Sequence, residues 1–158
     1  MALRIQIIVL GKPKHVYLAE GIADYCARLQ HYAQIKLIEA KELKSARRLS
    51  EPERLSREAA ELAKLLRPGD FLIALDRQGE MPDSPGLAKL LQDCMNRNYN
   101  PITFLIGSEL GLAPALLRRA DKVLSFSKLT FTHDMCRLIL LEQLYRAFTI
   151  LAGQQYHK

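Results

Sequence analysis

Continuous apolar runs, typical of buried strands, alternate along this chain with segments in which apolar residues have helical spacing. Residues 3–11 (LRIQIIVLG) form an apolar run that ends at a glycine, and residues 35–40 (IKLIEA) form a second, shorter run. Between them, apolar residues recur every three or four positions, which predicts a helix over residues 14–32. The chain therefore opens with a strand, a helix and a strand.

The next segment, residues 50–70 (SEPERLSREAAELAKLLRPGD), carries the clearest helix signals. Ser50 and Glu53 have the spacing of a capping box, and Pro52 stands in the first turn. Pro68 and Gly69 end the pattern.

Two later runs, residues 70–76 (DFLIALD) and 101–107 (PITFLIG), are apolar almost throughout, as in strands buried on both faces. A loop is expected over 77–86, followed by a helix that Ser84 and Pro85 cap and that continues to about Asn98.

The last third predicts a short helix over 113–120, a fifth strand over 122–127 (KVLSFS) and a long helix over 134–152. Strands that alternate with helices in this way predict an α/β fold, with a parallel sheet flanked by helices on both faces.

Length and composition fit one soluble domain over residues 1–158. The chain has 49% hydrophobic and 25% charged residues, and no apolar run reaches the roughly 18 residues that span a bilayer. The apolar start lacks the basic region and cleavage site of a signal peptide. Cys26, Cys94 and Cys136 lie far apart, which indicates free thiols in a reducing, cytoplasmic setting.

The net charge of +6 favours an anionic partner, with nucleic acid first, although charge that serves solubility alone is the other interpretation. Residues 41–67 hold eight Lys or Arg and five Glu, and residues 118–158 hold seven Lys or Arg and three acids. The positive charge is therefore concentrated in two segments.

Ligands of parallel α/β sheets bind beyond the carboxyl ends of the strands, and three predicted loops qualify: 76–79, 107–111 and 125–133. Gly107 and Gly111 have neither dinucleotide-binding nor Walker A spacing, and turn chemistry alone explains two such glycines. Small hydroxyls and apolar residues alternate in LSFSKLTF (124–131), which suits a backbone-rich pocket. From the pattern alone, an edge strand with Leu124 and Phe126 inward and the serines outward is favoured.

The final helix is apolar on more than one face. Leu141, Leu144 and Phe148 fall within about 40° of Arg137 on a helical projection. A helix buried on two sides in so short a chain predicts a homodimer interface. Arg137 is alternatively a side chain that snorkels to solvent.

Chemical motifs are sparse elsewhere. Glu142 and Arg146 have the spacing of an ion pair, which a plain surface pair also explains. His133 and Cys136 can meet on the helix as base and nucleophile, although coincidence is the favoured interpretation. No metal-ligand spacing stands out. Tyr156 and His157 can stack on a base and shuttle a proton, unless the end is an ordinary polar tail.

Six motifs occur in order along the chain: IIVLGK, LDRQG, FLIG followed by GL, LSFSKLTFTH, RLILLEQLYRAF and a terminal YHK. With these motifs the chain resembles the RlmH family of SPOUT methyltransferases. The resemblance spans nearly the whole chain and is most specific over residues 124–158.

The resemblance implies properties that composition and periodicity do not. Members have a C-terminal trefoil knot, form homodimers and use S-adenosylmethionine. They methylate N3 of a pseudouridine in the helix 69 loop of 23S rRNA on assembled ribosomes, without a metal and away from membranes.

By resemblance, the residues expected to bind the cofactor are Leu75, Gly107, Phe126, Ser127, Lys128, Leu129, Thr130 and Phe131. The residues expected at the RNA side of the active site are His133, Arg137, Glu142, Arg146, Tyr156 and His157.

Two positions depart from the family pattern. Ser108 stands where a second glycine is usual, so its side chain can narrow the cofactor mouth. Thr132 stands where proline is usual and is predicted to cap the last helix.

The chemistry leaves His133 and His157 both open as the base that removes the N3 proton. Arg137 or Arg146 can stabilise the developing anion or hold a phosphate. Two alternative functions stay open: a ribosome-binding relic without turnover, and a SPOUT methyltransferase acting on tRNA.

Overall fold

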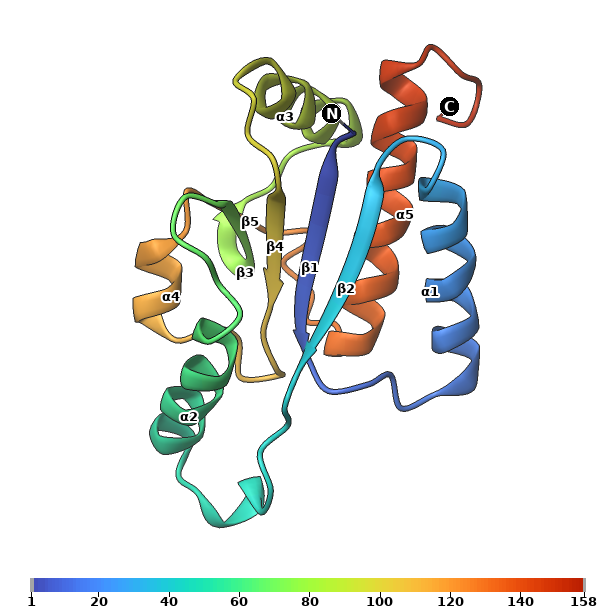
Figure 1. Ribbon diagram of the computed structural model, residues 1–158. Coiled ribbons are helices and arrows are strands. Elements are labelled where there is room, and N and C mark those ends of the chain that lie inside the picture. Colours follow the sequence, from blue (N-terminus) through green and yellow to red (C-terminus); the bar gives the residue numbers. More distant parts are fainter. Residues whose placement is uncertain (1, 158) are drawn as a thin grey trace.

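A parallel sheet forms the middle layer of the molecule (Figure 1). The computed structural model describes residues 2–157, and within them five strands lie in the order β2-β1-β4-β3-β5. Their bounds are β1 Arg4–Leu10, β2 Gln34–Ala40, β3 Phe71–Glu80, β4 Ile102–Ile106 and β5 Lys122–Leu124. Every pairing is parallel, which confirms the α/β class predicted from the sequence.

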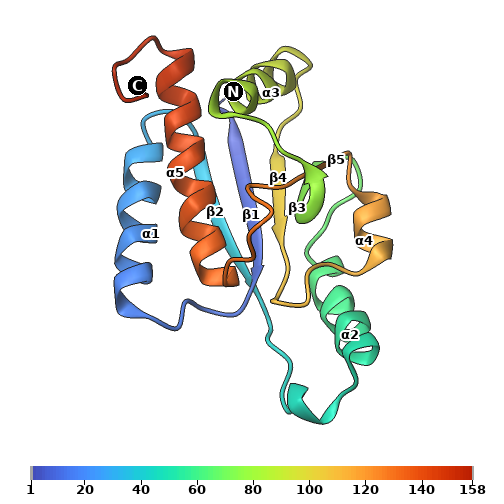
Figure 2. The same ribbon diagram turned by 180° about the vertical axis from the view of Figure 1, so that it is seen from behind.

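Helices cover both faces of this sheet (Figures 1 and 2). The helices are α1 Val16–Leu29, α2 Glu51–Ala63, α3 Ser84–Asn96, α4 Pro114–Arg119 and α5 His133–Leu151, with one 3-10 turn, η1 Ala46–Arg48, that the sequence did not indicate. Helices α1, α3 and α5 share one apolar core with the sheet, and α2 and α4 share the other. Among residues 2–157, no helix combines the length and hydropathy that crossing a membrane requires.

The predicted helix starts follow from side chains that accept backbone N–H bonds. Ser50 caps α2 by accepting from Glu53, and Thr132 caps α5 by accepting from Met135 at 3.2 Å. The cap predicted at Ser84 is wrong, because Asp83 caps α3 by accepting from the amide of Gly86 at 2.7 Å. Ser84 instead donates to Gln143 of α5.

The two strand ends nearest the predicted ligand loops differ from expectation. Strand β3 continues to Glu80, where a loop was predicted, because the Glu80 carbonyl accepts from the amide of Ser125 at 2.7 Å after an irregularity in the β3–β5 pairing. Strand β5 stops at Leu124, so the strand predicted over 122–127 is too long. The chain leaves the sheet at Ser125, which is buried and does not face outward as an edge strand would require.

Candidate functional site

A cavity of about 340 Å³ opens at the carboxyl ends of β3, β4 and β5. The three loops singled out in the sequence all contribute to it: residues 76–78 after the regular part of β3, residues 107–112 after β4 and residues 124–133 after β5. Its volume lies within the range of small-molecule sites. The rule that ligands bind beyond parallel strand ends therefore located the cavity correctly.

Seven of the eight residues expected to bind a cofactor line this cavity: Leu75, Gly107, Phe126, Ser127, Leu129, Thr130 and Phe131. Lys128 does not line the cavity and is exposed. Asp76, from the first of the three predicted loops, also lines it, and so does Leu55 of α2, which the sequence did not indicate.

The serines after β5 act on their own backbone. The Ser125 hydroxyl donates to the Ser127 carbonyl at 2.9 Å and accepts from the Ser127 amide at 3.3 Å. The Ser127 hydroxyl then accepts from the amide of Leu129 at 2.9 Å. These local bonds compete with strand pairing, which explains why β5 ends early and why the loop has a defined shape beside the cavity.

The loop after β4 needs glycine for internal reasons. A Cβ on Gly107 would lie 2.3 Å from the carbonyl oxygen of Gly111, and Gly111 itself has a φ of +81°. The Gly111 amide donates to the Ser108 carbonyl at 2.9 Å and closes a turn. The two glycines are therefore required by the turn that forms the cavity wall.

His133 lies at the start of α5 and lines the cavity. Its Nε2 lies 3.3 Å from Oδ1 of Asp134, a buried carboxylate that also accepts from the amide of Lys14. Cys136 lines the same cavity, and burial raises the pKa of its thiol. A protonated thiol is a poor nucleophile, so the His133–Cys136 pair is not an activated one.

Arg137 is buried, with 1% of its surface exposed. Its guanidinium donates to the carbonyl of Gly11 at 2.9 Å and to that of Leu10 at 2.6 Å, at the end of β1. Burial lowers its pKa, and the charge of Asp134 opposes this. The snorkelling interpretation is therefore wrong, and within one chain this arginine binds backbone.

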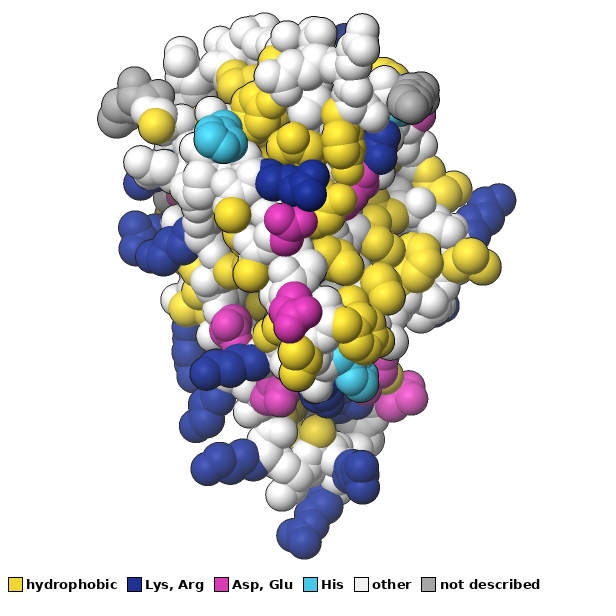
Figure 3. All heavy atoms as spheres, turned by 90° about the vertical axis from the view of Figure 1, so that its right-hand side faces the viewer, with side chains coloured by type: hydrophobic (Ala, Val, Ile, Leu, Met, Phe, Trp, Pro, Cys, Tyr) yellow, Lys and Arg dark blue, Asp and Glu magenta, His cyan; other side chains and the backbone are white. Residues whose placement is uncertain are grey.

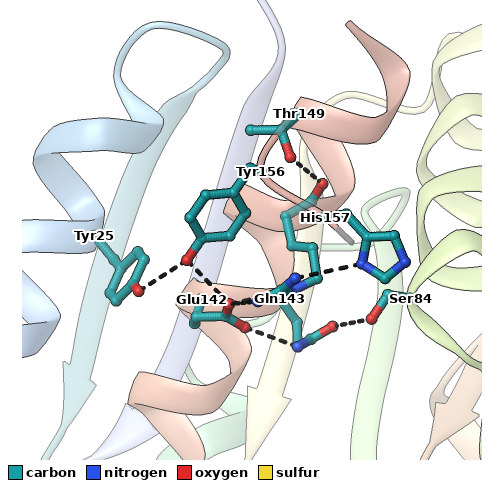
Figure 4. Close-up of polar contacts among 8 residues, drawn as sticks. Tyr25, Ser84, Glu142, Gln143, Thr149, Tyr156 and His157 are labelled. Carbon is teal, nitrogen blue, oxygen red and sulfur yellow. Dashed lines mark hydrogen bonds and ion pairs between the residues drawn. The ribbon is translucent and has the colours of Figure 1, made fainter. Parts of the chain in front are cut away.

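The other four residues expected at the RNA side form a separate cluster at the far end of α5 (Figure 4). Arg146 pairs with Glu142 through Nε at 3.1 Å and Nη2 at 2.5 Å, and its Nη1 lies 3.3 Å from Nδ1 of His157. Tyr156 donates to Glu142 at 3.2 Å, and its ring lies under the Arg146 guanidinium. The interpretation of 156–157 as an ordinary polar tail does not fit these contacts.

Tyr25 of α1, which was not among the predicted site residues, belongs to the same cluster. Its hydroxyl lies 3.1 Å from that of Tyr156 (Figure 4). Burial, the hydrogen bond with Tyr25 and the charge of Glu142 raise the pKa of Tyr156. Helical spacing placed Tyr25 on the buried face of α1, but no local signal indicated a partner 131 residues away.

The cavity and this cluster do not meet within one chain. Nine residues separate His133 from Glu142 on α5, which corresponds to about 14 Å along the helix axis. Among residues 2–157, no three His, Cys, Asp or Glu side chains come together in a way that could hold a metal ion.

The outward face over α1 and α5 carries apolar side chains (Figure 3). Met135, Leu138 and Ile139 of α5 are partly exposed, and Val16 and Tyr17 at the start of α1 are mostly exposed. Lys and Arg side chains gather at the lower end of the same view (Figure 3).

Comparisons with known proteins agree with this geometry. The family described as "Predicted SPOUT methyltransferase" matches residues 3–157. The proteins called ribosomal RNA large subunit methyltransferase H are 47% identical in Desulfotalea psychrophila (97% of this chain, 98% of the relative) and 42% identical in Desulforamulus reducens (99% of each).

Among solved structures, the fold is similar to a probable methyltransferase from Bordetella pertussis Tohama I, with a TM-score of 0.56, 15% identity and coverage of 90% of this chain and 93% of that one. That likeness concerns the fold. The full-length match to the family and the high identity to its named relatives go further, and they show that this chain belongs to the SPOUT methyltransferase family, in the group of the ribosomal RNA large subunit methyltransferases H.

Proposed function

We propose that this chain, acting as one domain over residues 1–158, methylates N3 of a pseudouridine in the helix 69 loop of 23S rRNA on assembled ribosomes, using S-adenosylmethionine. One observation carries the proposal: a cavity built by the three strand-end loops lies in a chain that matches large-subunit rRNA methyltransferases over its full length.

The cavity suits this cofactor by its lining. Leu75, Ile106 and Leu124 offer apolar surface at the strand ends, and the loop from Phe126 to Phe131 adds both apolar and hydroxyl side chains to the lining. An adenosine needs this combination of apolar surface and a few polar contacts. When bound, S-adenosylmethionine supplies a methyl group on a sulfonium, which is already electrophilic. The residues of the chain need only align the reacting atoms and remove one proton.

His133 is one candidate for the base, because it lines the cavity and has Asp134 beside it.

His157 is the other candidate, but in this conformation its Nδ1 faces Arg146. A guanidinium only donates, so Nδ1 accepts and the proton lies on Nε2. His157 must therefore leave Arg146 before it accepts a proton at Nδ1.

A homodimer unites the two halves of the site. The cluster begins at Glu142, six residues after Cys136, the last cavity-lining residue on α5, which corresponds to about 9 Å along the helix axis. In the proposed homodimer, a second copy packs against the apolar face over α1 and α5 (Figure 3), and its cluster completes this cavity. In this arrangement, Arg146 stabilises the developing substrate anion or binds a phosphate.

The crossing from β5 to α5 supports the trefoil knot. Strand β5 lies at the sheet edge next to β3, whereas α5 packs between α1 and α3, so residues 125–132 cross the end of β3. A Cβ on Gly79, near the end of β3, would lie 2.6 Å from the backbone of Val123 in β5, so the two strands lie very close together just before this crossing.

The basic segment after β2 gives a surface for ribosome docking. Lys41, Lys44, Arg47 and Arg48 are exposed, and within residues 2–157 none of them forms an ion pair. They follow the carboxyl end of β2, and the cavity opens at the carboxyl ends of other strands of the same parallel sheet. The proposed setting is the cytoplasm, where ribosomes work.

The two alternative functions have weaker support. The relic interpretation depended on Ser108 narrowing the cavity mouth, yet its hydroxyl is bound to Glu58 of α2. A tRNA substrate is not favoured by any feature of the cavity, and the relatives carry the name of a large-subunit rRNA enzyme.

The decisive experiment is methyl transfer from labelled S-adenosylmethionine to ribosomes that lack the modification, with the product mapped by mass spectrometry. Already methylated ribosomes and free 23S rRNA are the matched controls. We expect label on the helix 69 pseudouridine in unmodified ribosomes only. A folded protein that transfers no label to them, or that labels tRNA, contradicts the proposal.

A further inference from the structure

Helix α2 reaches the cavity wall through two charged side chains that the reaction does not use. Arg54 and Glu58 lie one helical turn apart and pair through Arg54 Nε at 3.0 Å from Glu58 Oε2. The other oxygen of Glu58 accepts from the Ser108 hydroxyl at 2.7 Å. Arg54 also places Nη2 2.6 Å from Glu109. Two consecutive residues of the turn over 107–111 are therefore attached to α2.

Glu58 is 6% exposed, and burial of a carboxylate is costly unless both oxygens find donors. Arg54 supplies one donor and Ser108 supplies the other. If residue 108 were glycine, Oε1 of Glu58 would lose the hydroxyl that donates to it. Ser108 and Glu58 are thus a matched pair, and the serine has a specific partner.

The attachment acts on the cavity. The Ser108 hydroxyl also accepts from the amide of Leu110 at 3.3 Å, and its carbonyl accepts from the Gly111 amide. Residues 107–112 form one wall of the cavity. Burial alone would raise the pKa of Glu109, but its backbone hydrogen bond and Arg54 outweigh this and lower it, so Glu109 stays ionised and bound.

We infer that Arg54, Glu58 and Ser108 are positioning residues that hold the turn over 107–111 in the conformation that binds the nucleoside. This inference rests on the proposed function, and its effect is on cofactor affinity. A turn released from α2 occupies the binding conformation for a smaller fraction of the time, and the apparent affinity falls by that fraction.

The test compares Ser108→Ala with Ser108→Thr and Ser84→Ala. The Ser84 hydroxyl also donates at 2.7 Å, to Gln143, but it lies outside the cavity, which makes it the matched control. Calorimetry with S-adenosylhomocysteine is expected to give about tenfold weaker binding for Ser108→Ala, the effect of about one hydrogen bond. Ser108→Thr keeps the hydroxyl and should retain most of the affinity. The KM for S-adenosylmethionine should rise while kcat stays close to the parent value.

A double-mutant cycle with Glu58→Gln sharpens this test. Because Ser108 acts through Glu58, the loss caused by Ser108→Ala should be smaller in the Glu58→Gln background. Parent-like affinity and KM in Ser108→Ala would overturn the inference, and so would an equal loss in Ser84→Ala.

Amide exchange separates this inference from the proposed function, because it needs no cofactor. The amide of Gly111, which donates to the Ser108 carbonyl that the substitution keeps, should exchange faster in Ser108→Ala than in the parent or in Ser84→Ala. If the parent binds no S-adenosylhomocysteine, the proposed function fails, and this exchange rate still decides whether α2 holds the turn. Unchanged exchange of the Gly111 amide would overturn the inference.

Discussion

The two ends of α5 carry two different kinds of site. At its start, the cavity is built from loops of one chain whose serine hydroxyls and glycines fix backbone shape. At its end, Glu142, Arg146 and Tyr156 form a cluster of charges and rings that the tail completes. The cavity has the volume of a small-molecule site, and none of the four cluster residues lines it. On the proposed function, the cavity binds the cofactor, and a second copy brings the cluster to it.

The strongest test of this division mixes two inactive variants. We expect His133→Ala and His157→Ala each to lose activity, by about 100-fold or more for whichever is the base. If both are needed and the tail serves the partner's cavity, a mixed dimer regains one intact site, and the mixture recovers about a quarter of parent activity. Methyl transfer after co-refolding measures this.

A mixture that stays inactive contradicts a shared site, because a tail that serves its own cavity leaves every chain with one defect. The matched control is a mixture of two preparations of His157→Ala, which contains no intact tail.

Replacing Arg137 tests whether the part of α5 between the two sites has a structural role. Arg137→Ala leaves the carbonyls of Leu10 and Gly11 and the carboxylate of Asp134 without their buried partner. We expect a loss of about 3–5 kcal/mol in the free energy of unfolding, measured by denaturant titration. Arg28→Ala removes an exposed ion pair with Asp24 and should change the free energy of unfolding far less than Arg137→Ala does. Equal losses would show that Arg137 is not a structural anchor.

The basic segment after β2 should affect ribosome binding without affecting either site. Replacing Lys44, Arg47 and Arg48 with alanine should weaken ribosome binding and reduce the slope of log K against log salt by about 2–3. Binding of S-adenosylhomocysteine should not change. An unchanged salt slope would place the docking surface elsewhere. Filter binding across a salt series provides the measurement.

The smallest expected effect concerns Tyr25. Tyr25→Phe removes the hydroxyl that contacts Tyr156 and should loosen the tail by about 1 kcal/mol. Faster amide exchange at residues 154–157, with unchanged cofactor affinity, would show that the cluster and the cavity are energetically independent. A change in cofactor affinity would show instead that the two are coupled within one chain.

Much of the cavity could be predicted because its causes are local in sequence. Apolar runs predicted β3 and β4, and the strand-end rule then located the loops beside them. The shape of residues 125–129 was not predictable from alternation, since the serines bind their own backbone. The burial of Arg137 and the partnership of Tyr25 with Tyr156 depend on contacts more than 100 residues apart. Periodicity carries no information about such pairs.

The turn after β4 also has a consequence for how such sequences can diverge. At position 107 any side chain meets the backbone of Gly111, so no single substitution is tolerated without rebuilding the turn. At position 108 a side chain is accepted because α2 offers it a partner. Exchange between glycine and serine at 108 should therefore depend on residue 58, and the order in which the two mutations arise decides whether the intermediate is fit. Adjacent residues of one loop thus evolve under different constraints.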